Sequence, residues 1–223
     1  MDLSKSYEYF QPEKVRGRIH IIGCGAIGST VGELIAKTGL TNITLYDFDK
    51  VESHNIANQM FTENDIGKYK VDALAERMIS INPEMKQSLK IEREGWHGQK
   101  LAGYVFLCVH NIDLRREIAT SNKDNMNVKA MFDFRMRLTD AQHYAADWKN
   151  VKMIEAFLNS MNFTQEEGKA ETPVSACNME LSFASTVFTI VAAGISNFVR
   201  FVKDGVLKKF IVADVEDFSI LAL

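Results

Sequence analysis

The sequence contains few cysteines and few prolines, three of each among 223 residues. Cys24, Cys108 and Cys177 lie far apart and no CxxC pair occurs, which argues against a disulfide scaffold and against a structural zinc site built from cysteines. Neither sign of charge is in large excess, since 26 Lys and Arg residues face 29 Asp and Glu residues. A protein that binds nucleic acid by neutralising phosphates is therefore not expected. The cysteine usage favours a reducing, cytoplasmic location.

The N-terminus and the longest apolar segment bear on targeting. Residues 1–13 are polar and lack the apolar region of a signal peptide. Residues 181–199 carry no charge and are long enough to cross a bilayer. Two interpretations fit this segment, a transmembrane helix or a helix buried inside a soluble domain. Its polar residues and the lack of a second such segment favour a helix enclosed by protein, so no membrane association is expected.

Length and composition are those of an ordinary globular protein, with 46% hydrophobic and 25% charged residues. A chain of this size buries roughly 70–75% of its unfolded surface, which is enough for a hydrophobic core. We expect an N-terminal segment over residues 1–18 and a single domain over residues 19–223, with a crossover loop at about 162–177.

Apolar runs and helical repeats alternate along the chain. Seven segments have the character of strands: 18–22, 43–47, 88–92, 104–109, 128–134, 142–148 and 210–215. Helical spacing of apolar residues follows the first glycine cluster and recurs at about 67–82, 112–121, 151–161 and 181–204. Residues 48–66 and 162–175 are long polar loops. This order predicts an α/β, Rossmann-like fold, with a mostly parallel sheet, helices on both faces and an antiparallel extension toward the C-terminus.

A glycine motif joins the first strand to the first helix. Gly23 would form the turn, Gly25 would let phosphates approach the backbone, and Gly28 would let helix and strand pack closely. The helix N-terminus that follows offers unpaired N–H groups to an anion. Asp47, at the end of the second strand, can accept hydrogen bonds from a ribose diol. The structural alternative is a tight strand-to-helix turn without a ligand.

The motif does not separate a dinucleotide from ATP, so an NAD- or FAD-dependent oxidoreductase stays open at this point. The residues after Asp47 are more informative. They read Asp47-Phe48-Asp49-Lys50-Val51, then Asn55-Ile56-Ala57-Asn58-Gln59, Gly67-Lys68-Tyr69-Lys70-Val71 and Ile81-Asn82-Pro83. In these motifs the chain resembles the ThiF/MoeB/HesA family, relatives of the ubiquitin-activating enzymes, over about residues 19–115.

The resemblance implies a ThiF-like nucleotide-binding domain that uses ATP, with Mg²⁺, to adenylate the C-terminal carboxylate of a small ubiquitin-like or sulfur-carrier-like protein. It implies catalytic roles for Lys70, Arg115 and Cys177. It is also compatible with a homodimer. The nucleotide would contact twelve positions: Gly23, Gly25, Ala26, Ile27, Gly28, Asp47, Asp49, Asn55, Asn58, Lys70, His110 and Asn111. An amide and an ammonium facing the phosphates would stabilise the charge of a pentavalent α-phosphate.

Two positions depart from the family pattern. Asn58 stands where the family has an arginine, and His110 stands where it has the aspartate of an Asp-Asn pair. An arginine at a transferring phosphoryl group can contribute on the order of 10³–10⁵ in rate. Two interpretations therefore stay open, an active adenylating enzyme and a nucleotide-binding scaffold that has lost catalysis.

Cys177 has two interpretations as well. In some members of the family a cysteine in the equivalent loop accepts the activated protein as a thioester, and a thiol at a helix N-terminus is a good nucleophile. Alternatively, Cys177 packs the start of the long apolar helix. The zinc-binding CxxC pairs of many relatives have no counterpart here, so no metal ligands are predicted among the side chains.

Overall fold

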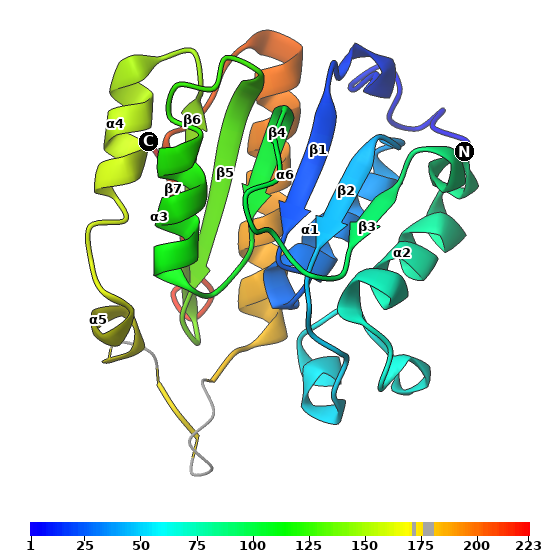
Figure 1. Cartoon of the computed structure of the whole chain (residues 1–223), viewed down its shortest axis with the longest axis horizontal. Helices are drawn as coiled ribbons and strands as arrows, with labels where there is room; N and C mark the ends of the chain where they lie inside the picture. The colour runs from blue at the N-terminus through cyan, green and yellow to red at the C-terminus, as the bar shows by residue number, and fades with distance from the viewer. Residues whose placement is uncertain (171–172, 176–180) are drawn as a thin grey trace.

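The computed structural model describes residues 1–170, 173–175 and 181–223, and Figure 1 shows one sheet covered by helices. The sheet has eight strands in the order β3-β2-β1-β4-β5-β6-β7-β8. Strands β1 to β5 run parallel, and β6, β7 and β8 are added antiparallel. The bounds of the strands are β1 Arg18–Ile22, β2 Ile43–Tyr46, β3 Lys90–Glu92, β4 Gly103–Leu107, β5 Val128–Met136, β6 Asp140–Asp147, β7 Phe210–Asp214 and β8 Ser219–Ala222.

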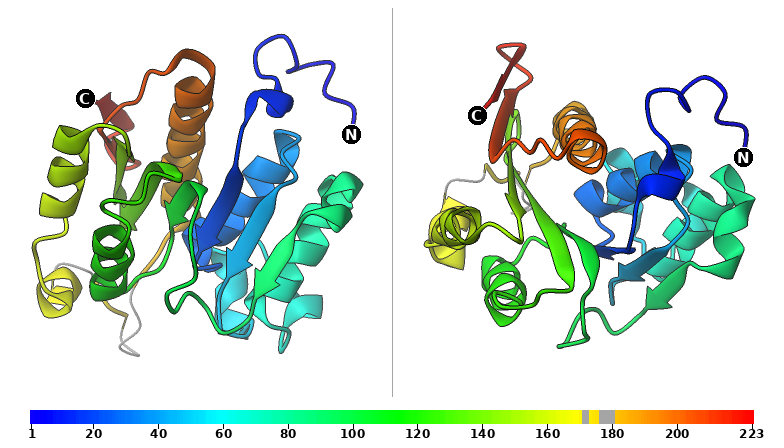
Figure 2. Two further views of the ribbon diagram at one scale, coloured as in Figure 1. Left: turned by 45° about the horizontal axis from the view of Figure 1, so that its top comes forward. Right: turned by 90° about the horizontal axis from the view of Figure 1, so that it is seen from above.

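The helices lie on both faces of this sheet, as the view from above in Figure 2 shows. Helices α1, α2 and α6 cover one face, and α3, α4 and α5 lie on the other. The bounds of the helices are α1 Ala26–Lys37, α2 Lys70–Ile81, α3 Ile112–Ser121, α4 Val151–Asn159, α5 Gln165–Ala170 and α6 Ala184–Asp204. The α/β fold, the mostly parallel sheet and the antiparallel extension are thus confirmed.

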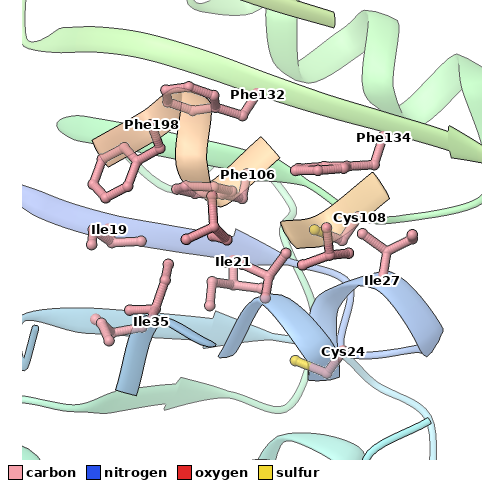
Figure 3. Packing of buried hydrophobic residues seen from close by; sticks show 14 of the residues in the cluster. Ile19, Ile21, Cys24, Ile27, Ile35, Phe106, Cys108, Phe132, Phe134 and Phe198 are labelled. Atoms are coloured by element: carbon pink, nitrogen blue, oxygen red, sulfur yellow. The ribbon is translucent and has the colours of Figure 1, made fainter. Parts of the chain in front are cut away.

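Each face of the sheet has its own hydrophobic core because side chains alternate along a strand. On the α1/α6 face, Phe106 stacks on Phe132 at 4.8 Å between ring centroids and meets the edge of Phe198 at 5.4 Å, as Figure 3 shows. On the α3/α4 face, Trp148 meets the edge of Phe157 at 5.8 Å. The chain therefore holds its sheet between two separate packed layers.

The sequence predicts that the long apolar helix is enclosed by protein. That prediction is wrong, because only one face of α6 is buried. Helix α6 buries one face, including Val187, Val191 and Phe198, while Phe188 on its other face is 45% exposed. Within the described residues it is the one helix long and apolar enough to cross a membrane, and 50% of its most apolar window is buried. The helix ends where expected, because Gly205 adopts a left-handed conformation with φ 70°.

Two short elements were not expected from the sequence. Helix α5 lies within the segment predicted as a polar loop, and it begins with a reciprocal capping box between Thr164 and Glu167. Strand β8 pairs with β7 and has no buried residue. The loop over residues 48–66 contains the short 3-10 turns Ser53–Ala57 and Glu63–Asp65. The domain boundary at residue 18 stays a prediction.

Candidate functional site

A cavity of about 880 Å³ opens at the carboxyl ends of the parallel strands. These ends point toward the lower edge of the sheet in Figure 1, where α5 also lies. In the sheet, β2 and β3 lie on one side of β1, and β4 and β5 lie on its other side. The reversal of strand order between β1 and β4 creates the crevice in which ligands bind in open α/β sheets.

The cavity has two halves, which we name by the strands that form them. The parallel half is lined by Gly23, Gly25, Asp47, Asp49 and Lys70, among others. The antiparallel half is lined by residues of the end of β5, the start of β6 and the segment after α4: Arg135, Arg137, Asp140, Gln142, Tyr144, Ser160, Phe163, Gln165 and Glu167.

The glycine motif is a turn in which each glycine has a different neighbour. Gly23 has a φ of +93°, and a Cβ there would lie 2.7 Å from the backbone nitrogen of Val109. A Cβ on Gly28 would lie 1.8 Å from the carbonyl oxygen of Gly23. A Cβ on Gly25 would meet nothing within 4 Å. Gly23 and Gly28 are therefore required for packing, and Gly25 faces open space in the cavity.

Helix α1 begins at the cavity without the usual caps. Its N-cap is Gly25, no side chain accepts a hydrogen bond from its first turn, and that turn contains no acidic residue. Gly25, Ala26 and Ile27 all line the cavity. The first N–H groups of a helix have no intrahelical acceptor, so this end of the cavity is suited to an anion.

Asp47 and the Asp49–Lys70 pair form the polar wall of the parallel half. The Asp47 carboxylate accepts the backbone N–H of Cys24 at 2.6 Å and that of Asp49 at 2.8 Å. Burial raises the pKa of Asp47, and the two backbone donors oppose this shift. The Lys70 ammonium donates to Asp49 at 2.9 Å and is held there at the start of α2.

The loop after β4 brings His110 and Asn111 to the same cavity. The side-chain oxygen of Asn111 accepts the backbone N–H groups of Asp113 and Leu114, so Asn111 is the N-cap of α3. Asn58 and Gln59 also line the cavity, and the buried Gln59 Oε1 has no hydrogen-bond partner among the described residues. Both family departures, Asn58 and His110, thus lie at the cavity.

Some of the predicted site residues do not line the cavity. Gly28 is buried behind the turn. Asn55 is buried, and its side-chain oxygen accepts the backbone N–H of Glu52 within a short 3-10 turn. Lys68, another lysine of these loops, donates instead to Asp65 and Glu76. Cys177 lies outside the described residues.

Arg115 has a buried partner that the sequence did not indicate. Its guanidinium donates to the carbonyl oxygen of Val109 at 2.6 Å and to the carboxylate of Asp133, which is completely buried. Arg135 donates to the other oxygen of the same carboxylate at 2.7 Å. Both arginines line the cavity. We call Arg115, Asp133 and Arg135 the arginine–aspartate cluster.

Sequence reasoning missed several lining residues. Arg135 lies in β5, just beyond the strand predicted over residues 128–134, and no motif assigns it to the site. Gln59 also lines the cavity, and its position next to Asn58 in the sequence is the signal that could have indicated it. Phe48, within the motif that begins at Asp47, and Trp96, in a loop that no motif marks, also line the parallel half.

The sequence profile of the ThiF family matches residues 8–193 of this chain. The ubiquitin-like modifier-activating enzyme 5 of Drosophila mojavensis is 28% identical over 144 residues, which are 57% of this chain and 35% of the relative. The protein of the same name from Drosophila grimshawi is 30% identical over 144 residues, with the same shares of the two chains. The chain thus spans 35% of the length of these relatives.

Solved structures agree with the fold. The crystal structure of E. coli MccB with ATP has a TM-score of 0.68 at 17% identity and covers 95% of this chain and 65% of that chain. The structure of PaaA has a TM-score of 0.71 at 16% identity, with the same shares covered. At this identity the similarity establishes the fold alone, whereas the family profile extends from the N-terminal segment into α6. The chain is a member of the ThiF family.

Proposed function

We propose that this chain binds ATP in the parallel half of the cavity and adenylates the C-terminal carboxylate of a small ubiquitin-like protein or peptide. One observation carries the proposal: the glycine turn, Asp47 and Lys70 line a single cavity at the point where strand order reverses. The relatives are named as ubiquitin-like modifier-activating enzymes, and one related structure is of MccB with ATP.

The phosphates would lie against the uncapped start of α1, where Gly25 leaves room for close approach. Asp47 would accept hydrogen bonds from the ribose hydroxyls. Each carboxylate oxygen can accept two hydrogen bonds, so the backbone donors of Cys24 and Asp49 leave capacity for a ligand. The aromatic residues Phe48 and Trp96 would border the base.

Lys70 would supply the positive charge that stabilises the reacting phosphate. The Lys70 ammonium is paired with Asp49, so binding of a polyphosphate would exchange or share that partner. A fixed cation of this kind acts by electrostatic stabilisation of developing charge. Asn58 is uncharged where the family pattern has an arginine, so Lys70 supplies more of this positive charge here.

Mg²⁺ would enter with the nucleotide. Among the described residues, no group of three or more His, Cys, Asp and Glu side chains is placed to hold a metal ion. Mg²⁺ in nucleotide sites is commonly held by phosphates, water and only one or two carboxylates. The residues present therefore fit a nucleotide-borne ion better than a separate protein-bound one.

Equilibrium binding of ATP tests the first part of the proposal. Lys70→Ala should weaken ATP binding about 10- to 100-fold, as expected for a lost charge-assisted hydrogen bond, while folding is preserved. Lys68→Ala removes an equal charge two residues away and should change the affinity less than about twofold, because Lys68 is paired outside the cavity. Equal effects of the two substitutions in calorimetric titrations would contradict the assignment of Lys70.

Turnover separates the enzyme from the scaffold. With a small protein substrate present, exchange of radiolabelled pyrophosphate into ATP is the expected sign of adenylation, and Lys70→Ala should abolish it. ATP binding without exchange would instead favour the catalytically impaired scaffold, which the positions of Asn58 and His110 at the cavity support. A homodimer in the cytoplasm, without nucleic-acid or membrane partners, is the setting we propose for either activity.

A further inference from the structure

We propose that the arginine–aspartate cluster is an anion subsite that binds the carboxylate of the protein or peptide to be activated. This proposal rests on the proposed function, and it assigns the second reactant to the antiparallel half of the cavity. It gives a specific role to Arg115, for which the resemblance implied only a catalytic part, and to Arg135, which no motif of the sequence indicates.

The charges of the cluster do not cancel. Asp133 is completely buried and is shared by the guanidinium groups of Arg115 and Arg135, whose side chains are 8% and 14% exposed. The two guanidinium groups thus carry two positive charges against the single negative charge of Asp133, in a largely buried part of the cavity wall. Buried charges in proteins are generally paired, so the excess positive charge favours an anion on the cavity side.

The two guanidinium groups retain donors for a ligand. Arg115 uses its Nε for Val109 and its Nη1 for Asp133 and the carbonyl oxygen of Phe134. Arg135 uses its Nε for Asp133, and its two Nη atoms donate to the carbonyl and hydroxyl oxygens of Ser160 at 2.6 and 2.9 Å. A guanidinium carries five N–H donors, so each arginine has two left among the described contacts.

The cluster is rigid before any ligand arrives. The Arg135 guanidinium lies 4.3 Å from the ring centroid of Tyr144 and 5.4 Å from that of Phe163. Arg115 fixes the loop after β4 through Val109 and fixes β5 through Phe134. Groups that are held in place bind a ligand without paying for their own ordering.

The neighbouring charged groups of the cavity have partners of their own. Asp140 lies 3.6 Å from Arg137, and Glu167 accepts the backbone N–H of Thr164. In the parallel half, Lys70 is matched by Asp49. Further titratable lining residues are Glu94, His110 and Lys169. Among the lining groups that the structure describes, the cluster is a buried one in which positive charge exceeds negative charge.

A bound carboxylate at this position suits the proposed reaction. A carboxylate oxygen forms a bond to the α-phosphorus of ATP, the bond from that phosphorus to the oxygen bridging to the β-phosphate breaks, and pyrophosphate leaves with that electron pair. No proton, oxidant or reductant is needed. Both reactants are anions, so a cation beside the carboxylate offsets their repulsion and holds the nucleophile near the phosphate.

Titration with acetate tests the subsite without a known partner. The Nε–Hε signals of the arginines are followed by NMR while sodium acetate is added at constant ionic strength. Arg135→Gln should raise the acetate dissociation constant at least tenfold, because it leaves Arg115 and Asp133 as a neutral pair. Lys129→Gln removes a charge near the opposite end of β5 and should change the acetate dissociation constant less than twofold. Absence of saturable acetate binding to the unsubstituted chain would overturn the proposal.

Repeating the acetate titration in the presence of saturating ATP shows whether the cluster binds a carboxylate or a phosphate. If the cluster serves the carboxylate substrate, acetate binds with a dissociation constant within about threefold of the ATP-free value. Loss of acetate binding would mean that the cluster holds a phosphate, which overturns the assignment to the carboxylate.

A second variant covers the case in which Arg135→Gln fails to fold. Arg135→Lys keeps the charge and should retain acetate binding within tenfold. Loss of binding in the folded lysine variant would also contradict the charge-based proposal. A chain that binds acetate but not ATP would refute the proposed function and leave the anion subsite intact.

Discussion

The two halves of the cavity are built in different ways. In the parallel half, most ligand-facing groups belong to one strand–helix–strand unit and the helix that follows it, the loop after β3 adds Trp96, and much of the surface is backbone. In the antiparallel half, the ligand-facing groups are side chains from β5, β6, α3 and the segment after α4. A backbone site depends on the absence of side chains, whereas a side-chain site depends on buried charge being balanced. The two halves should therefore fail in different ways when they are altered.

The largest effect is expected at the glycine turn. Gly28→Val should prevent folding or cost more than about 4 kcal/mol, since its Cβ would lie 1.8 Å from the carbonyl oxygen of Gly23. Gly25→Ala should cost less than about 1 kcal/mol, because that position is open, but it should weaken ATP binding. Urea unfolding and calorimetry separate the two effects. A folded Gly28→Val variant with native stability would show that this half tolerates side chains.

The next largest effect is expected at Asp133. Asp133→Ala leaves two guanidinium groups without their carboxylate and should destabilise the fold by about 3–5 kcal/mol. Asp49→Ala, in the parallel half, breaks an ion pair whose carboxylate is 51% exposed and should cost less than about 1 kcal/mol. Urea unfolding at neutral pH measures both. Similar losses in the two variants would remove the distinction between a fully buried carboxylate and a half-exposed one.

The smallest of these effects is a dependence of stability on pH. Burial lowers the pKa of His20 on β1 and of His143 on β6 to about 4, from an ordinary value of 6.5. Between these values the unfolded chain binds more protons, so stability falls as the pH falls from 6.5 toward 4. Each histidine should contribute a loss of about 2 kcal/mol between pH 7 and pH 5.

Urea unfolding at the two pH values measures this loss, and the variant His143→Gln, which lacks one of the two buried histidines, assigns it. His143 lies 3.1 Å from the carbonyl oxygen of Asp133 and 3.3 Å from the amide nitrogen of Asn197, a pattern suited to a neutral ring. His143→Gln should remove about half of the pH-dependent loss whatever its own stability at pH 7. An unchanged pH dependence in this variant would place the titrating groups elsewhere.

The sequence predicts the parallel half well because its signals are local. A buried strand, a glycine turn and a helix follow one another within residues 18–37, and the structure has them as β1 and α1. Gly23 and Gly28 are required by contacts made within the motif itself or with the adjacent strand end. The role of Asn55 could not be read in the same way, because its side chain serves a turn that lies in an irregular loop.

The antiparallel half could not be predicted because its contacts depend on tertiary structure. Arg115 and Asp133 meet only through the pairing of β4 with β5 and the packing of α3 beside them. Nothing in the residues around Arg135 signals that Ser160 will accept its hydrogen bonds. Helix α5 is the exception, since Thr164 and Glu167 form a capping box that the sequence displays.

The placement of two cysteines has a practical consequence for chemical labelling. Cys24 and Cys108 are buried, and burial raises the pKa of both thiols, so neither is a nucleophile in the folded chain. The chain has three cysteines in all. Of the two described thiols, Cys24 is fully buried and Cys108 borders the cavity, so a maleimide or iodoacetamide reagent should modify both slowly in the native protein and Cys108 before Cys24.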